Sequence, residues 1–363
     1  MLPGLAGADA QAWAEQVQAL LRDRSADWPS PLTLCFGVAA YTPGTLGQAV
    51  READERLYEQ KGVVLRSRRG GRLVITASSG PNLLRHAETT LAPVSEQFGG
   101  SFGALFQKQY IQSVEEARQF VDFMDPEPGV AAVELGAGAG RIAFDGGLAR
   151  RIGPEGVLLL TDPSPALLRQ ALRRAAQENA HWVSGIEAFA ERLPILAESA
   201  DLVVGALFWH LCDPQTTVKE IYRVLLPGGR VVLSTALAFT WPPAWQEALE
   251  PIREALARHR LPFRHFAPEP GELAAYLEWG GLVVERRAEA LMTMAFTDLW
   301  SLRALLSQGG YLEIMVRGLP EAERNPTIEQ VLRRVDELWP KTKPADWSGD
   351  DPLEYVAARR PSA

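Results

Sequence analysis

The sequence predicts an α/β protein whose larger part is a doubly wound sheet with helices on both faces. From Val130 onward, short apolar runs alternate with amphipathic segments, which is the pattern of strands joined by helical crossovers. The first apolar run leads directly into a glycine-rich loop, as happens where a ligand binds at the carboxyl end of a parallel strand. Two helical segments begin with a capping residue followed by proline. A smaller α/β segment precedes this sheet.

The strands and helices of the larger part follow from these patterns. The strands are predicted at Ala131–Leu135, Gly156–Thr161, Trp182–Ser184, Leu202–Ala206 and Arg230–Ser234, followed near the end by Leu282–Arg286 and Leu353–Ala358. The helices between them include Pro165–Gln177, which Ser164 caps, and Pro214–Leu225, which Asp213 caps. Seven strands are thus expected in a Rossmann-like sheet.

Residues 1–80 are predicted to form a separate small α/β unit, with strands at Leu32–Val38 and Leu73–Thr76. The runs Leu34–Ala39 and Ala53–Lys61 resemble the latter half of a diguanylate cyclase (GGDEF) domain. The signature sequence and metal-binding acids of that family are absent, so the resemblance implies a degenerate half-domain without cyclase activity. Two interpretations remain: a packing unit through which the chain forms a homodimer, or a retained sensor of a guanine nucleotide.

Residues 81–125 are predicted to be a helical linker between the two parts. Ser113 and Glu116 have the spacing of a capping box at the start of a helix. One face of that helix is apolar and is expected to pack inward; it carries Val114, Ala117, Val121 and Met124.

The glycine-rich loop is the most informative motif of the chain. Gly136, Gly138 and Gly140 alternate with other residues just after Glu134, and glycine lets the backbone turn tightly and approach a ligand. The helix expected next directs its positive N-terminal end at the same place. Enzymes that bind dinucleotides use the different spacing G-x-G-x-x-G. A carboxylate beside the loop also suits a cationic ligand better than a pyrophosphate.

This loop and the segments after it resemble the class I S-adenosylmethionine-dependent methyltransferases. The matching segments are Glu134–Gly140, Leu160–Asp162, Glu187–Pro194, Ala200–Val204 and Leu225–Leu233, in the order that the family has them. The resemblance implies S-adenosylmethionine as the cofactor, in-line transfer of its methyl group to a small-molecule acceptor, and an antiparallel last strand. It is closest to the branch that includes quinone-biosynthesis methyltransferases. Linker helices in this family often form a lid over the cofactor.

The resemblance also implies which residues hold the cofactor. Asp162, followed by Pro163, would accept the ribose hydroxyls, although an aspartate at this place can also cap the next helix. Phe189 replaces the family's aspartate that accepts the adenine amino group; its ring is expected to pack on the adenine, with the Ala190 amide reaching the ring. Glu191 is either a substitute acceptor or a solvated glutamate. The expected set is Glu134, Gly136, Ala137, Gly138, Gly140, Asp162, Pro163, Phe189, Ala190, Ala206 and Leu207.

His210 follows the fourth strand and is the histidine nearest to the predicted site. Methyl transfer from a sulfonium depends mainly on alignment of the two reactants in a dry pocket. His210 is therefore interpreted either as a base that deprotonates an oxygen or nitrogen acceptor, or as a loop histidine packed beside the cofactor. Phe208 and Trp209 are candidates for the wall of the pocket.

The residues that select the acceptor are expected after the fifth strand, in Thr240–Met294 and in the helices up to Leu338. A helical insertion at about 240–280, within a methyltransferase domain at 126–363, is where this fold class commonly builds the acceptor pocket. The basic run from Arg253 to His265 is interpreted either as a patch for an anionic substrate or as a solvated face.

Composition argues against several other classes of protein. The net charge of −8 disfavours a broad basic face for nucleic acid. No run reaches the roughly 18 apolar residues of a membrane span, and no signal peptide is evident. Two cysteines without metal-ligand spacing predict a reducing, cytoplasmic location and no metal site. Two alternative functions remain: a nicotinamide-dependent oxidoreductase, and a non-catalytic regulatory protein that binds S-adenosylmethionine or a nucleotide.

Overall fold

The computed structural model describes residues 114–238, 241–263, 267–294, 296, 298–308 and 311–362, together with the backbone of 64–66 and 72–74. Strands β1 (Val64–Arg66) and β2 (Arg72–Val74) pair in a two-stranded sheet. β2 overlaps the strand predicted at Leu73–Thr76. The remaining predictions for residues 1–113, including the GGDEF-like half-domain and the first part of the linker, lie outside the described residues.

The larger part contains the predicted seven-stranded sheet. In sheet order the strands are β5 (Val183–Glu187), β4 (Val157–Asp162), β3 (Ala131–Leu135), β6 (Ala200–Ala206), β7 (Leu225–Ala236), β9 (Gly349–Arg359) and β8 (Val283–Met294). The first five strands in this order, from β5 through β7, run parallel to one another, whereas β9 is antiparallel to both of its neighbours. The antiparallel last strand is therefore confirmed. Chain order reverses between β3 and β6, which is the switch point at which doubly wound sheets bind ligands.

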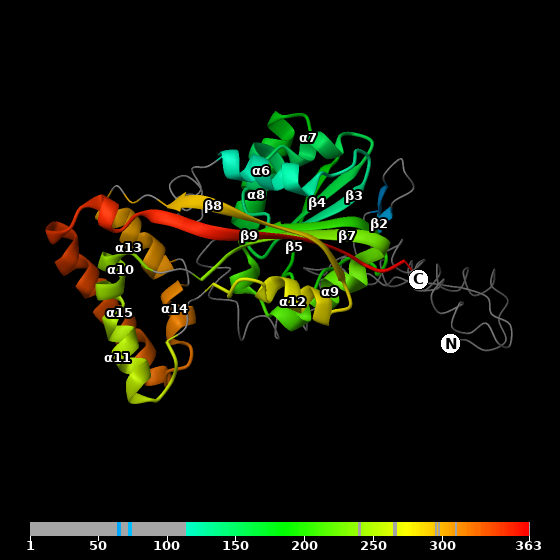
Figure 1. Cartoon of the computed structure of the whole chain (residues 1–363). Coiled ribbons are helices and arrows are strands. Elements are labelled where there is room, and N and C mark those ends of the chain that lie inside the picture. The colour runs from blue at the N-terminus through cyan, green and yellow to red at the C-terminus, as the bar shows by residue number, and fades with distance from the viewer. Residues whose placement is uncertain are drawn as a thin grey trace, which may run out of the picture. The chain divides into compact units, whose positions relative to one another are not determined.

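Helices cover both faces of this sheet (Figure 1). α6 (Val114–Met124), α7 (Leu148–Ile152) and α8 (Pro165–Gln177) lie on one face, and α9 (Pro214–Val224) and α12 (Glu272–Trp279) lie on the other. Because both faces are covered, β3 and β4 are buried along their whole length. The predicted caps are confirmed. The Ser164 hydroxyl accepts from the third amide of its helix at 3.3 Å, and the Asp213 carboxylate does so at 2.8 Å.

The segment after the glycine loop differs from the single helix expected there. It forms a five-residue π-helix, η1 (Arg141–Asp145), and then turns at Gly147, whose φ is +84°, before α7 begins. Gly146 lies so close to α6 that a Cβ atom there would come within 2.9 Å of the Ala117 carbonyl oxygen. The helix expected after the glycine loop is thus divided at the point where α6 packs closely against it. The dipole of one long helix does not point at this loop.

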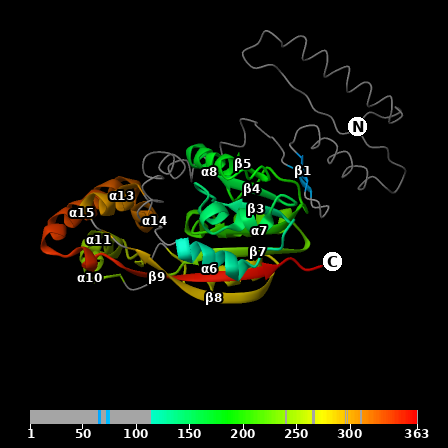
Figure 2. The same ribbon diagram turned by 90° about the horizontal axis from the view of Figure 1, so that it is seen from above.

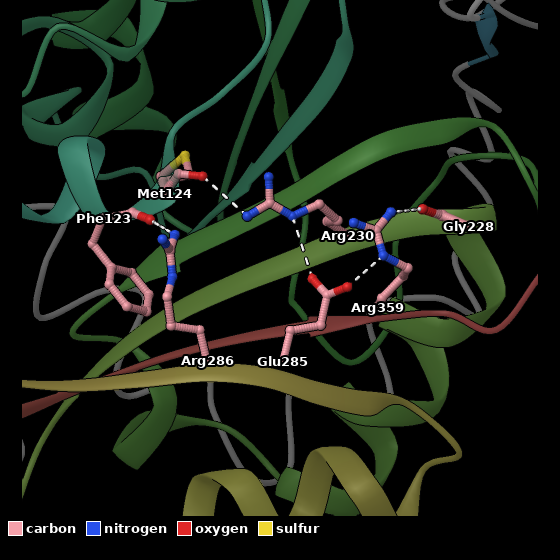
Figure 3. Close-up of polar contacts among 7 residues, drawn as sticks. All are labelled: Phe123, Met124, Gly228, Arg230, Glu285, Arg286 and Arg359. Atoms are coloured by element: carbon pink, nitrogen blue, oxygen red, sulfur yellow. Dashed lines mark hydrogen bonds and ion pairs between the residues drawn. The ribbon is translucent and has the colours of Figure 1, made fainter.

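α6 is fastened to the sheet at its C-terminal end (Figure 3). The Phe123 carbonyl oxygen accepts from the Arg286 guanidinium, which also lies 4.4 Å from the centre of the Phe123 ring. The Met124 carbonyl oxygen accepts from Arg230 at 3.2 Å, and Arg230 in turn lies 3.7 Å from the Glu285 carboxylate. Cations at this end satisfy carbonyl groups that have no partner within the helix.

A second group of helices, called here the helical module, follows the carboxyl ends of β7 and β8 (Figures 1 and 2). It comprises α10 (Pro243–Ala248), α11 (Glu250–Arg258), α13 (Leu299–Gln308), α14 (Tyr311–Val316) and α15 (Glu321–Leu338), with the short turns η3 (Trp339–Lys341) and η4 (Pro344–Asp346) leading to β9. Its own apolar core contains Trp245, Phe296 and Trp347. The module is built from two segments of the chain that α12 and β8 separate, so it extends well beyond residue 280.

Candidate functional site

The predicted site residues follow four neighbouring strands, β5, β4, β3 and β6. The carboxyl ends of these parallel strands lie side by side and are called here the edge of the sheet. The register pairs Leu135 at the end of β3 with Thr161 in β4 and Gly205 in β6. It also pairs Asp162 with Glu187 at the end of β5. The structure therefore places the following segments along one edge: Glu134–Gly140, Asp162–Pro163, Phe189–Ala190 and Ala206–Leu207.

The glycine loop turns over this edge in a conformation that favours glycine. Gly136, Gly138 and Gly140 have φ angles of +60°, +57° and +83°. A Cβ atom at Gly136 would come within 2.7 Å of the Phe208 side chain, and one at Gly140 within 2.6 Å of the Phe144 ring. Larger residues at these two positions would clash, so the two glycines allow the loop to pack against Phe208 and Phe144.

Asp162 joins the glycine loop to the start of α8. Its Oδ2 accepts from the Gly138 amide and its Oδ1 from the Ser164 amide, each at 2.8 Å. The side chain is buried, and burial raises its pKa to about 6. Ser164, and not Asp162, provides the side-chain cap of α8. Each carboxylate oxygen has a second lone pair that remains for a ligand hydroxyl.

Glu134 is a buried carboxylate whose hydrogen bonding is incomplete. It is 2% exposed, and among the described residues its Oε2 has no hydrogen-bond partner. Burial raises its pKa to about 8; the charge of Arg141 opposes this rise and the charge of Asp162 adds to it. A buried polar atom without a partner costs free energy, so this atom marks a place where a ligand's donor is expected.

Arg141 connects the glycine loop to α6. Its guanidinium forms a buried ion pair with Glu116, and the other oxygen of the Glu116 carboxylate accepts from the Tyr355 hydroxyl at 3.1 Å. Burial raises the pKa of Tyr355, and the neighbouring Glu116 charge adds to that rise. The leading helix is thereby tied by charge to the loop and by a hydroxyl to β9.

This network was not predicted, because Glu116 was assigned to a capping box. Ser113, the other half of that box, lies outside the described residues. The buried stripe of α6 runs through Glu116, Ala117, Phe120, Val121 and Met124, whereas Val114 is 41% exposed. The signal that was available is the spacing of Glu116 and Phe120, which puts the glutamate on the apolar face.

Two glutamates fasten the loop after β5 to α9. Glu191 Oε1 accepts from the Asp213 amide at 2.8 Å, and Glu220 Oε1 accepts from the Leu193 amide at 2.7 Å. Burial raises the pKa of Glu191. Glu191 is therefore not the solvated glutamate of one interpretation, because its carboxylate holds the start of α9. Phe189 is half-buried in the same turn.

The chain leaves β6 in a strained conformation. Leu207 has a φ angle of +58°, which is uncommon for a residue other than glycine, and its amide donates to the Ser234 carbonyl oxygen at 2.9 Å. The next residue, Phe208, packs so closely on Gly205 that a Cβ atom there would come within 2.3 Å of the ring. Strain of this kind collects at ligand sites, where the surrounding structure holds it in place.

His210 lies in the short turn η2 (Trp209–Leu211) and contacts the helical module. Its ring stacks on that of Tyr311, with centroids 5.9 Å apart and planes inclined by 17°. Its Nδ1 atom is buried. Trp209, proposed as a pocket wall, is 2% exposed and packs 6.0 Å from the Tyr276 ring of α12, so it belongs to the core. Tyr311 was not predicted, because no local pattern links residues about a hundred positions apart.

Three described members of the basic run, Arg253, Arg258 and His259, have partners on the module itself. Arg258 and His259 pair with Glu323 at 3.4 and 2.7 Å, and the Arg253 guanidinium lies 4.7 Å from the centre of the Phe263 ring. These contacts favour the solvated-face interpretation over a patch for an anionic substrate.

In the described part of the chain, none of the helices is both long enough and apolar enough to span a bilayer. The histidine, cysteine and acidic side chains of the same part do not gather in any group of three that would hold a metal ion.

Comparison with known proteins places the similarity on the same segments. Residues 133–233 match the family model described as a methyltransferase domain. The chain is 34% identical over 109 residues to an arsenite methyltransferase of Halobacterium salinarum, covering 30% of this chain and 27% of that protein. It is 40% identical over 105 residues to a malonyl-[acyl-carrier protein] O-methyltransferase of Marinomonas sp., covering 28% of this chain and 37% of that protein. The matches thus span well under two thirds of these relatives' lengths.

A solved structure, that of a SAM-dependent methyltransferase from Aquifex aeolicus, is 16% identical with a TM-score of 0.38. It covers 51% of this chain and 86% of the other.

Proposed function

We propose that this chain binds S-adenosylmethionine across the ends of β3 to β6 and transfers its methyl group to a small-molecule acceptor. The observation that carries the proposal is the buried Glu134 carboxylate, which has one oxygen unpartnered among the described residues and lies beside a glycine loop. A ligand with cationic groups and a ribose fits the two neighbouring acids better than an anionic one. The similarity of residues 133–233 to methyltransferase domains supports the same ligand.

The residues of the edge divide into three parts by what they would hold. Glu134 would accept from the ammonium group, with the backbone of Gly136, Ala137, Gly138 and Gly140 turned toward the same end of the ligand. Asp162 would accept from the ribose hydroxyls while keeping its two amide partners, and Pro163 would shape the turn beside it. Phe189 and Ala190 would contact the base, and Ala206 and Leu207 would lie under the methionine portion.

When bound, S-adenosylmethionine would supply a methyl group activated by its sulfonium: the acceptor would bond to the methyl carbon in line with the breaking carbon–sulfur bond, and S-adenosylhomocysteine would be the leaving group. This chain would contribute alignment and exclusion of water, which are worth several kcal/mol in well-oriented reactions. His210 is the group proposed to take the acceptor's proton, because its Nδ1 is buried against the protein and its ring is fixed by Tyr311. The acceptor would then lie between η2 and the helical module, whose residues would select it.

The finer assignments extend this proposal. The acceptor would resemble those of the quinone-methyltransferase branch. Residues 1–80 would be a GGDEF-like half-domain without cyclase activity that joins two copies of the chain, and the protein would act in the cytoplasm without nucleic acid. The helical insertion at about 240–280 would supply only the first part of the acceptor pocket, since α13 to α15 complete the module.

The test is calorimetric titration of the whole chain with S-adenosylmethionine and S-adenosylhomocysteine, repeated on Asp162→Ala. The expected result is micromolar binding that the substitution weakens at least tenfold, or about 1.4 kcal/mol. Absence of binding to the unchanged protein would overturn the proposal. A nicotinamide dinucleotide titration run in parallel identifies the oxidoreductase alternative.

Binding alone does not establish transfer of the methyl group. A screen of hydroxyl, amine and thiol acceptors, read by formation of S-adenosylhomocysteine, tests that step. Tight binding without turnover across the screen would favour the non-catalytic regulatory alternative. If turnover is found, unchanged turnover in His210→Ala would remove His210 as the base.

A further inference from the structure

Asp351 is a buried acid that the cofactor site described above does not use. It is 5% exposed, and its carboxylate forms neither an ion pair nor a hydrogen bond with the described residues. Its neighbours on the same face of the sheet are apolar, because Met292 lies opposite it on β8 and Leu353 follows two residues later on β9. Burial raises the pKa of Asp351 to about 7, and the charge of Asp350 adds to this rise.

The register places Asp351 on the same face of the sheet as the site residue Ala206. Ala206 pairs with Ser234 of β7, which pairs with Tyr355 of β9. Asp351 precedes Tyr355 by four residues, so it shares that face and lies beyond the end of β7, where β9 leaves the helical module (Figure 1). Two strand spacings of about 4.8 Å and four residues of about 3.3 Å each put the Cα atoms of Ala206 and Asp351 on the order of 16 Å apart. A small molecule that starts at the edge can span this separation.

The charges at this end of the sheet favour a cation over an anion. Glu134 and Asp162 are buried acids of the edge. Arg141, beside the glycine loop, is already paired with Glu116. A buried carboxylate without a partner is costly, and a cation that donates hydrogen bonds to it offsets that cost most effectively. The surroundings of Asp351 therefore suit a donor that carries positive charge.

We propose that Asp351 binds a protonated amine of the methyl acceptor, at a distance from the atom that receives the methyl group. This inference rests on the proposed function and names the chemical class of its acceptor: a small molecule with a nucleophile at one end and an ammonium group at the other. A ring acceptor like those of the quinone-methyltransferase branch would carry the amine as a substituent. Asp351 would select the acceptor without touching the reacting atoms.

The experiment titrates the whole chain, saturated with S-adenosylhomocysteine, with two phenols of matched shape. Tyramine carries an ethylamine arm, and in tyrosol a hydroxyl group replaces the amine. At about pH 8 the Asp351 carboxyl is mostly ionised and an alkylamine is mostly protonated. Calorimetry should find that tyramine binds at least tenfold more tightly than tyrosol. A diamine and a diol of the octane chain repeat the comparison over a longer span.

In Asp351→Asn the preference for the amine should fall to less than about threefold, because the amide keeps the shape of the side chain but not its charge. Asp350→Asn is the matched control. Asp350 is the preceding residue, points to the opposite face of β9 and accepts from the Thr293 hydroxyl at 2.7 Å. This variant should keep the preference within about twofold of the original. Thermal unfolding of both variants checks that the sheet remains folded.

The outcomes separate this inference from the proposed function. If S-adenosylhomocysteine does not bind, the proposed function fails. If it binds, but neither amine binds or the neutral partners bind as tightly as the amines, the proposed function stands and this inference is wrong. A preference for the amine that persists in Asp351→Asn would also overturn the inference, because another group would then hold the cation.

Discussion

The edge of the sheet and the indoles of Trp245 and Trp347 in the helical module differ in how their buried polar groups are satisfied. At the edge, Glu134 keeps a buried carboxylate oxygen without a partner among the described residues, and Leu207 holds a strained backbone. In the module, the indole N–H of Trp245 donates to the Trp347 carbonyl oxygen at 2.7 Å, and that of Trp347 donates to Thr342 at 2.8 Å. The module's aromatic core thus satisfies these groups internally, whereas the edge leaves groups for something else to satisfy.

This difference indicates that the module contributes mainly to stability and the edge mainly to ligand binding. Buried polar groups without partners, together with left-handed backbone, lower stability and persist where a ligand uses them. A core of closely packed aromatic rings, in which the Trp245 and Trp347 N–H groups have acceptors, raises stability and rigidity. Variants of the module should therefore change the free energy of unfolding more than cofactor affinity, and variants of the edge should do the reverse.

The largest expected effect comes from Trp245→Ala in the module. Trp245 is 5% exposed and lies 5.1 Å from Trp241, 5.8 Å from Phe296 and 6.1 Å from Trp347, measured between ring centroids. Its removal leaves a cavity and an unpartnered carbonyl, which should lower the free energy of unfolding by about 3–5 kcal/mol. Urea denaturation measures this loss, and calorimetry should find S-adenosylhomocysteine affinity within about twofold of the original.

Trp300→Ala is the matched control, since Trp300 is 63% exposed on the neighbouring α13. It should change stability by less than about 0.5 kcal/mol. If Trp245→Ala lowers the free energy of unfolding by less than about 1 kcal/mol, or lowers cofactor affinity tenfold, the module does not act mainly on stability as expected.

The next largest effect is expected from Glu134→Gln, which should raise the free energy of unfolding and lower the affinity for the cofactor. The pKa of this carboxyl group is about 4.5 in the unfolded chain, and burial raises it to about 8 in the folded protein. The folded state therefore binds the extra proton between these values, and its stability falls as the pH rises from about 5 to 8. Glutamine does not titrate, so the variant should become more stable than the original protein as the pH rises through that range. One pKa unit corresponds to about 1.4 kcal/mol, so the difference in the free energy of unfolding should reach a few kcal/mol at pH 8.

Cofactor binding should respond in the opposite direction. A cationic ligand favours the ionised carboxylate, so S-adenosylmethionine affinity of the original protein should rise between pH 6 and 7.5, while Glu134→Gln should bind at least tenfold more weakly at pH 7.5. Asp162 titrates in both proteins, so the difference between their pH profiles isolates Glu134. Calorimetry in buffers of different ionisation enthalpy counts the released proton. Equal pH profiles in the two proteins would show that Glu134 does not face the cation.

A smaller effect is expected from Asp162→Asn. The amide oxygen can still accept from one backbone amide, whereas the new NH₂ group cannot replace the acceptor that faces Gly138 or Ser164. Cofactor affinity should fall about tenfold, or 1.4 kcal/mol, with a loss of stability of about 1 kcal/mol from the buried amide that loses its acceptor. Asp201→Asn, at the other end of the sheet where the carboxylate accepts from the Ala131 amide at 2.8 Å, is the control and should leave affinity unchanged. Equal losses of affinity in both variants would trace the effect to folding.

The sequence predicted the edge far better than the module, and the reason is physical. Ala131–Leu135 and Pro165–Gln177 have the predicted bounds, because local rules set them: an apolar run ending in glycine, and a serine cap followed by proline. The division of the helix after Gly140 was missed, because it accompanies the packing of Gly146 against α6. Trp245 and Trp347 lie about a hundred residues apart in the sequence and meet edge-on, and no local pattern predicts which indoles come into contact.

The smallest effect concerns a ring contact that joins the edge to the module. His210 and Tyr311 stack at 5.9 Å, and an aromatic pair of this kind contributes about 0.5–1.5 kcal/mol. A double-mutant cycle of His210→Ala and Tyr311→Ala, measured by urea denaturation, should give a coupling free energy of about 0.5–1 kcal/mol, with Tyr311→Phe keeping most of it. If the edge and the module are coupled here, S-adenosylhomocysteine affinity should fall about twofold in Tyr311→Ala and remain unchanged in Tyr311→Phe. Additive single effects, within about 0.3 kcal/mol, would mean that the stack transmits nothing and that the two regions are independent at this contact.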